Sequence, residues 1–251
     1  MSYETYKTLI YIWMGVAVAV FLLLFKVTAP YGRHSSKKWG PQVSNRLGWV
    51  IMEAPGMILL LFYVLTHIAN QNAMTWVLVG LYIFHYINRT FIFPFRTRTK
   101  TKKMPLVVML MAIVFNLANG FFLGYYFAHF ADYSISDFVG VQFISGLILF
   151  VLGMYINWDY DNRLIHLRKP GETGYKIPHG GLFKYISCPN LMGEVIEWTG
   201  YALMSWSLPA LSFFVWTIAN LVPRARSHHK WYRKNFENYP LKRKALIPFV
   251  I

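Results

Sequence analysis

Seven long apolar stretches constrain this chain more than any other feature of its sequence. A helix needs about 20 apolar residues to cross the hydrocarbon core of a bilayer. Stretches near this length lie at about residues 8–27, 47–68, 73–95, 105–129, 139–159, 187–205 and 207–223. The last two are separated by only a few residues and predict a tight hairpin. We therefore predict an all-α integral membrane protein with seven transmembrane helices.

The basic residues are distributed unevenly between these stretches. The chain has 25 Lys and Arg against 10 Asp and Glu, a net charge of +15. Residues 26–47, 96–104 and 160–186 hold five Lys or Arg each, the tail from residue 224 holds eight, and the other three loops hold none. Basic residues concentrate in the cytoplasmic loops of membrane proteins. The pattern therefore predicts an N-terminus outside and a cytoplasmic C-terminus, in the endoplasmic reticulum membrane of a eukaryote or the inner membrane of a bacterium.

Composition narrows the class of protein and its partners. Charged residues make up 14% of the chain, against roughly 25% in soluble domains. The excess of positive charge would suggest nucleic acid in a soluble protein, but the apolar stretches attribute it to topology, so membrane lipid is the expected partner. Neither nucleic acid nor an obligate protein partner is indicated. Residues 1–251 show no internal repeat and are predicted to form one domain, whose first apolar run is a membrane helix rather than a cleaved signal.

Several kinds of site are not indicated by the sequence. The single cysteine, Cys188, excludes an intrachain disulfide, and the eight histidines lack metal-binding spacing. Ser187 has no evident base partner for nucleophilic chemistry. The chain contains neither the glycine pattern of a Rossmann fold nor a P-loop, so a nucleotide would have to bind in another way.

Ionisable residues inside the apolar stretches are the first functional candidates, because charge within a membrane is costly. They are Glu53, His85 with Tyr86 and Arg89, Glu194 with Glu197, and Asp159 with Asp161. At about 1.5 Å per residue, all lie in the half of the bundle nearer the basic loops. The pattern predicts a polar cavity there, although ion pairs such as Arg89 with a glutamate would explain part of it. Asp159 fits a solvated helix end equally well.

Two basic segments resemble an anion site. Residues 168–181 are rich in glycine and proline and predict a defined turn-rich loop. Arg224, His228 and Tyr232 recur every four residues and would share one helical face. The alternative is a basic stripe that binds lipid headgroups, and charge alone does not separate the two.

The segment from Gly153 to Ala202 and the C-terminal sequence YPLKRKALIPFVI closely resemble the steroid 5α-reductase family, the 3-oxo-5α-steroid 4-dehydrogenases. Upstream, YGRH at Tyr31–His34, MEAP at Met52–Pro55 and HYINRTFIFP at His85–Pro94 fit the same family in the same order. The resemblance covers about residues 31–251.

The resemblance implies a seven-helix fold, NADPH as hydride donor, and reduction of the Δ4 double bond of 3-oxo-Δ4-steroids to 5α-3-oxosteroids. It implies that Glu53 and Tyr86 contact the ketone oxygen. The implied cofactor contacts are Asn157, Asp161, Arg168, Tyr175, Asn190, Glu194, Arg224, His228 and Tyr232. Arg89 and Glu197 match family positions as pocket or support residues. Met52 stands where some members have glutamine, which bears on the choice of substrate.

The implied chemistry is physically consistent. Hydride addition to the β-carbon of an enone places negative charge on the carbonyl oxygen, and hydrogen-bond donors aimed at that oxygen stabilise it. Tyr86 has a phenolic donor. Glu53 donates when protonated, a form that burial favours.

Three other functions remain open. A reductase of the same fold could act on another lipid enone, a polyprenol or an enoyl thioester. A membrane methyltransferase using S-adenosylmethionine can also end in a basic, aromatic segment. A lipid carrier or channel is a third alternative, although a channel is expected to be polar through its full depth.

Overall fold

The computed structural model describes residues 1–30, 32–99, 101–169, 172 and 174–251, and their fold is almost entirely helical. The helices are α1 (Tyr3–Lys26), α2 (Asn45–Thr66), α3 (Ala73–Ile87), α4 (Phe93–Arg96), α5 (Leu106–His129), α6 (Val141–His166), α7 (Pro189–Ser205) and α8 (Leu208–Asn235). A π-helical turn, Asn88–Ile92, joins α3 to α4, so the two continue as one long helix. Short 3₁₀ turns lie at Gly32–His34, Lys37–Trp39, Ile68–Asn70, Ile135–Val139 and Gly181–Lys184. The prediction of a helical protein is confirmed.

Within the described residues, six helical segments are long and apolar enough to cross a membrane. They are α1, α2, the continuous α3–α4 helix, α5, α6 and α8. By their length and composition, these segments indicate a multi-pass membrane protein. The seventh predicted span, 187–205, is the helix α7, whose 17 residues extend about 26 Å, a little less than the roughly 30 Å hydrocarbon core.

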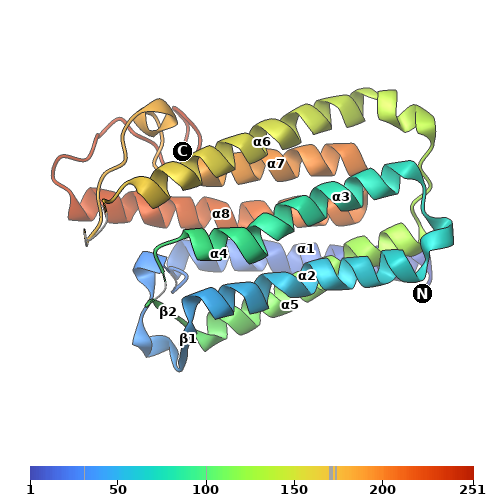
Figure 1. Cartoon of the computed structure of the whole chain (residues 1–251), viewed down its shortest axis with the longest axis horizontal. Coiled ribbons are helices and arrows are strands. Elements are labelled where there is room, and N and C mark those ends of the chain that lie inside the picture. The colour runs from blue at the N-terminus through green and yellow to red at the C-terminus, as the bar shows by residue number, and fades with distance from the viewer. Residues whose placement is uncertain (31, 100, 170–171, 173) are drawn as a thin grey trace.

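The helices run roughly parallel or antiparallel to one long axis, with the two chain termini at opposite ends (Figure 1). The closest helix pairs are α1 with α8, α2 with α5, and α6 with α7. Small residues allow this close approach. A Cβ added at Gly120 of α5 would lie 2.9 Å from the Cα of Gly56 in α2. Gly120 and Gly124 form a G-x-x-x-G motif, in which small residues let two helices approach closely.

The predicted hairpin between the last two apolar stretches is also confirmed. Trp206 adopts a left-handed conformation with φ of 40° and ends α7, and Ser207 precedes the first residue of α8. Pro209 lies in the first turn of α8, where its missing N–H has no helical partner to lose.

Two helices extend beyond the predicted spans. Helix α6 continues past residue 159 to His166, and α8 continues past Pro223 to Asn235. Hydropathy marks where a chain becomes polar, but a helix continues wherever its backbone hydrogen bonds and one packed face persist. Because α8 continues, Arg224, His228 and Tyr232 do lie on one helix, as their spacing suggested.

A small antiparallel sheet, which the sequence did not indicate, closes one end of the bundle. Strand β1 (Gln42–Ser44) pairs with β2 (Lys103–Pro105), with Val43 opposite Met104. The sheet joins two of the basic loops, 26–47 and 96–104. These loops, the end of α8 and the C-terminus all lie at the same end of the bundle, opposite the N-terminus (Figure 1).

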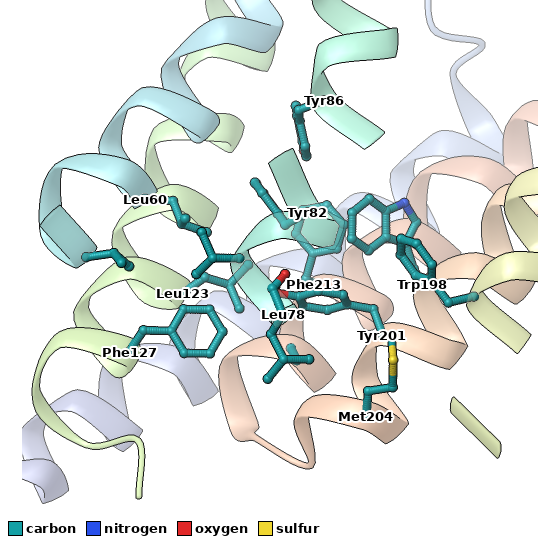
Figure 2. Close-up of a cluster of buried hydrophobic side chains, with 14 of the residues drawn as sticks. Leu60, Leu78, Tyr82, Tyr86, Leu123, Phe127, Trp198, Tyr201, Met204 and Phe213 are labelled. Carbon is teal, nitrogen blue, oxygen red and sulfur yellow. The ribbon is translucent and has the colours of Figure 1, made fainter. Parts of the chain in front are cut away.

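The main apolar core fills the half of the bundle away from the basic loops. Its side chains come from α2, α3, α5, α6, α7 and α8, and Figure 2 shows part of this cluster. Trp198 and Tyr201 pack inside it: they are 2% and 0% exposed, and the centroid of the Trp198 ring lies 4.4 Å from that of Phe213. Tyr86 lies at one edge of this cluster (Figure 2), so it marks the boundary between the apolar half and the polar half.

Candidate active site

Glu53 of α2 and Tyr86 of α3 meet at the side chain of Asn116 in α5. The Tyr86 hydroxyl donates to Asn116 Oδ1 at 3.1 Å. Asn116 Nδ2 donates to the Met52 carbonyl at 2.7 Å and lies 3.5 Å from Glu53 Oε2. Tyr86 and Asn116 are buried, whereas Glu53 is partly exposed. The two residues expected at the ketone are thus neighbours of one amide group.

Met52 contributes its backbone, rather than its side chain, to the group formed by Glu53, Tyr86 and Asn116. Its side chain is buried in an apolar cluster with Met104 and Met109, so the polar contribution of this residue is its backbone carbonyl. Sequence reasoning missed Asn116. The available signal was a polar side chain in the middle of a strongly apolar span.

Arg89 lies in the π-helical turn between α3 and α4, a distortion that is frequent at functional sites. Its buried guanidinium lies 5.2 Å from the ring of Trp49 and 5.1 Å from the ring of Phe93. The Trp49 indole donates to the Arg89 carbonyl at 2.9 Å. Arg89 interacts electrostatically with Glu194 and Glu53. It therefore brings a fixed positive charge to the acidic interior of the bundle.

Glu197 has a basic partner, the structural alternative expected for it. Its Oε1 lies 2.7 Å from His85 Nδ1, and both side chains are almost fully buried. The His85 ring packs edge-on against Trp198 at 4.7 Å. This pair joins α3 to α7 directly beside Tyr86, so it fixes the helix that carries the tyrosine.

Several polar residues that were expected to contact the cofactor lie together where α6 meets the start of α7. Asn157 Nδ2 donates to the Asn190 carbonyl at 3.0 Å, and Asn190 Nδ2 donates to Asp161 Oδ1 at 2.8 Å. Asn157 Oδ1 and Glu194 Oε2 are buried and have no hydrogen-bond partner among the described residues. Such orphaned polar atoms require explanation in a folded protein, and a polar ligand at this place would provide it.

Two cavities open at the basic end of the bundle. One is lined by Leu24 of α1 together with His34, Arg224 and His228, and the other by Arg33, Asn190, His228 and Tyr232. His228 borders both. Its Nδ1 is buried without a hydrogen-bond partner in the described part of the chain, as is His34 Nε2, and the two rings stack at 5.3 Å. These donors are positioned for phosphate, sugar or amide groups.

Arg33, a residue of the YGRH sequence, is prominent at this end of the bundle, although its sequence position predicted no role for it. Its guanidinium lies 5.0 Å from the ring of Tyr175, 4.6 Å from Trp231 and 4.5 Å from Tyr232. It donates to the Tyr232 hydroxyl at 3.2 Å. Arg33 therefore links the first basic loop to the end of α8. Tyr31, which begins the YGRH sequence, lies outside the described residues.

The electrostatics of this end favour an anion. Burial and the adjacent Arg33 lower the pKa of His34. Burial together with Arg168 and Arg33 lowers the pKa of Lys102. The positive charge of Arg33 therefore acts on both neighbouring groups, and a bound phosphate would offset it. A nucleotide therefore fits the residues present.

The loop 168–181 lies at the same end, although Pro170, Gly171 and Thr173 lie outside the described residues. Arg168 Nη1 donates to the Gly174 carbonyl at 2.9 Å, and its guanidinium lies 6.0 Å from the Tyr175 ring. Arg168 and Tyr175 are thus brought close to Arg33, as a shared role at one site requires.

One expectation from the sequence is wrong. Ser187 does have a base within reach, because its Oγ lies 2.7 Å from His229 Nδ1 and 2.6 Å from the Tyr239 hydroxyl. The partners lie far along the chain and are joined only when the C-terminal tail folds back against α7. Ser187 also donates to the Lys244 carbonyl at 3.0 Å, so this cluster fastens the tail.

Comparison with known proteins gives a consistent result. Residues 102–251 match the family described as 3-oxo-5-alpha-steroid 4-dehydrogenase. A steroid 5-alpha-reductase of Gossypium hirsutum is 41% identical over 240 residues, covering 94% of this chain and 93% of that protein. The 3-oxo-5-alpha-steroid 4-dehydrogenase 1 of Bos taurus is 40% identical over 247 residues, covering 97% and 96%. Its human counterpart is 40% identical over 244 residues, covering 96% and 94%.

Proposed function

The chain belongs to the steroid 5-alpha-reductase family of oxidoreductases, and from this membership we propose that it reduces the Δ4 double bond of 3-oxo-Δ4-steroids to give 5α-3-oxosteroids. The observation that carries the proposal is the meeting of Glu53 and Tyr86 at Asn116, beneath an end of the bundle built for an anion. An apolar polycyclic ketone suits these groups because it would reach them from the lipid.

The roles proposed for Glu53 and Tyr86 follow from the charge that develops during the reaction. Addition at the β-carbon of the enone makes the 3-oxygen negative. Tyr86 donates its phenolic hydrogen to that oxygen, which requires the hydroxyl to rotate away from Asn116 Oδ1. Glu53 donates from its protonated carboxyl. The Tyr86 ring and the Glu53 carboxyl are held in place before the substrate arrives, so only the phenolic hydrogen has to turn when the charge forms.

The basic end is proposed to hold NADPH, which supplies the hydride when bound. Arg224, His228 and Tyr232 from α8 would contact it together with Asn157, Asp161, Asn190 and Glu194 from α6 and α7, and Arg168 and Tyr175 from the loop. The orphaned nitrogens of His34 and His228 and the orphaned oxygen of Asn157 support this assignment. Arg33, with three aromatic neighbours, is added to the set.

We propose seven membrane crossings, with α7 as the sixth. Its 17 residues are shielded by the flanking helices α6 and α8, against which it packs. The positive-inside rule then puts the N-terminus outside and the basic end in the cytoplasm. The membrane is the endoplasmic reticulum in a eukaryote or the inner membrane in a bacterium.

The reaction is tested with purified protein, NADPH, and testosterone or progesterone. The expected product gains two hydrogens and has the 5α configuration by mass and stereochemical analysis. Oxidation of NADPH without a 5α-product would leave a reductase but exclude this substrate class. Replacing NADPH by S-adenosylmethionine controls for methyl transfer, and should give no modified steroid.

The two donors are tested with Glu53→Gln and Tyr86→Phe. Removing a preorganised donor at a developing oxyanion lowers kcat by about 10²–10³-fold where it has been measured, and a loss of that order is expected for each. Full turnover in both variants would show that other groups polarise the ketone.

A further inference from the structure

Asn116 has no obvious packing reason to be polar. It lies in the apolar helix α5 and is 2% exposed. Polar side chains at such depth are costly unless their hydrogen bonds are made. Its amide makes them with three neighbours: Tyr86, Met52 and, at longer range, Glu53.

The Met52 contact fixes which way the amide points. A backbone carbonyl only accepts hydrogen bonds, so the atom 2.7 Å from it must be Nδ2. The other amide atom, Oδ1, then faces Tyr86 and can only accept. The Tyr86 hydroxyl is consequently the donor in that contact, and its ring is held by stacking on Tyr82 at 4.5 Å.

The same orientation acts on Glu53. Nδ2 points toward Oε2 of the carboxyl group, so Oε2 is favoured as the acceptor and the acid proton is favoured on Oε1. Asn116 therefore stands between a phenol and a carboxyl group that would otherwise pair with each other. A carboxylate that accepts a phenolic hydrogen is stabilised in its charged form, in which it has no hydrogen to give to a ketone.

We propose that Asn116 is a positioning residue, which keeps Tyr86 and Glu53 from pairing with each other before the ketone binds and favours the acid proton on Oε1 of Glu53. This inference rests on the proposed function of those two residues. Asn116 acts through them and need not touch the substrate.

A double-mutant cycle tests the inference. Asn116→Leu replaces the polar amide by an apolar group and keeps a side chain of similar size. From the usual value of one hydrogen bond, it should lower kcat/KM about 2- to 12-fold in the otherwise unchanged enzyme. In a Tyr86→Phe background the hydroxyl that Asn116 holds is already gone, so the same substitution should have much less effect. Non-additivity of this kind reports contact between the two side chains in function.

Asn119 provides a matched control. It lies one turn further along α5, is also 2% exposed, and bonds to Trp13 and to the Phe115 carbonyl instead. Asn119→Leu should combine additively with Tyr86→Phe. If Asn116→Leu is also additive, or leaves kcat/KM unchanged, the inference is wrong.

Failure of the proposed function gives a different result. If Tyr86→Phe alone keeps full turnover, the role of Tyr86 falls and the positioning role falls with it. If Asn116→Leu does not fold, as judged by gel filtration in detergent, the cycle is run with Asn116→Ala, which adds no atoms near the Gly56 backbone. The same pattern is then required of Asn116→Ala.

Discussion

The contact between α6 and α7 depends on glycine, and Gly153→Ala is the most direct test of it. A Cβ added at Gly153 would lie 2.6 Å from the Cα of Glu197, and it would also meet the Gly193 carbonyl at 2.6 Å. Non-bonded carbons pack at about 3.5–4.0 Å, and both obstacles are backbone, which cannot rotate away. The two helices would therefore have to separate by about 1 Å.

Overpacking of this kind costs about 1–3 kcal/mol. For a chain of this size each kcal/mol lowers Tm by about 2–4 °C, so the expected fall in Tm is about 2–12 °C. The displacement also acts on Glu197, whose pairing with His85 holds the helix of Tyr86. Turnover should therefore fall together with Tm.

The assay is thermal unfolding in detergent, followed with a thiol-reactive fluorophore that reports exposure of the single cysteine, Cys188. Gly80→Ala in α3 is the matched control, because a Cβ there would meet no atom within 4 Å. Replacing a helical glycine by alanine without a clash should leave the free energy of unfolding unchanged or raise it by up to about 1 kcal/mol, so Tm should not fall. If Gly153→Ala melts at the same temperature as Gly80→Ala, the close packing of α6 and α7 described above is wrong.

Three further predictions address other parts of the molecule. Glu197→Leu should lower the free energy of unfolding by about 1–3 kcal/mol, because His85 loses its buried partner; chemical unfolding would measure the loss, and unchanged stability would contradict it. Arg33→Met should weaken NADPH binding in a calorimetric titration, whereas Arg226→Met, which removes an arginine that lies over Phe25 outside the two cavities, should not. Burial raises the pKa of the Cys188 thiol to about 12, so alkylation at pH 8 should be slow in the folded protein, should accelerate as the pH rises toward that value, and should be rapid in denaturant; fast labelling of the folded protein at pH 8 would refute the burial.

Much of the fold follows from hydropathy, since each apolar stretch became a helix. The errors occur where polar sequence is helical, as in the last turns of α6 and α8. Periodicity of apolar residues fades there, yet the helices continue because the loops and tail pack against them. The sheet of β1 and β2 was missed because three-residue strands in basic loops carry no alternating pattern.

The site was predictable in part, for a similar reason. Depth along each helix placed Glu53 and Tyr86 at a common level, and Asn116 joins them there. Depth says nothing of the rotation of each helix, so Asn116 could not be assigned as the shared partner. Ser187 and His229 show the same limit, because their contact depends on how the tail folds.

The basic residues at one end of the bundle are of two physical kinds, and the difference bears on function. Lys37 and Lys38 are exposed, and the solvation that exposure provides satisfies them, so topology alone explains them. Arg33 is half-buried among the rings of Tyr175, Trp231 and Tyr232. Beside it, burial and the charge of Arg33 lower the pKa of the half-buried His34. Crowding of this sort costs stability unless an anion relieves it. A charge pattern needed only for orientation would have no reason to accept that cost, and this is why the crowded residues, rather than the total of +15, support a nucleotide site.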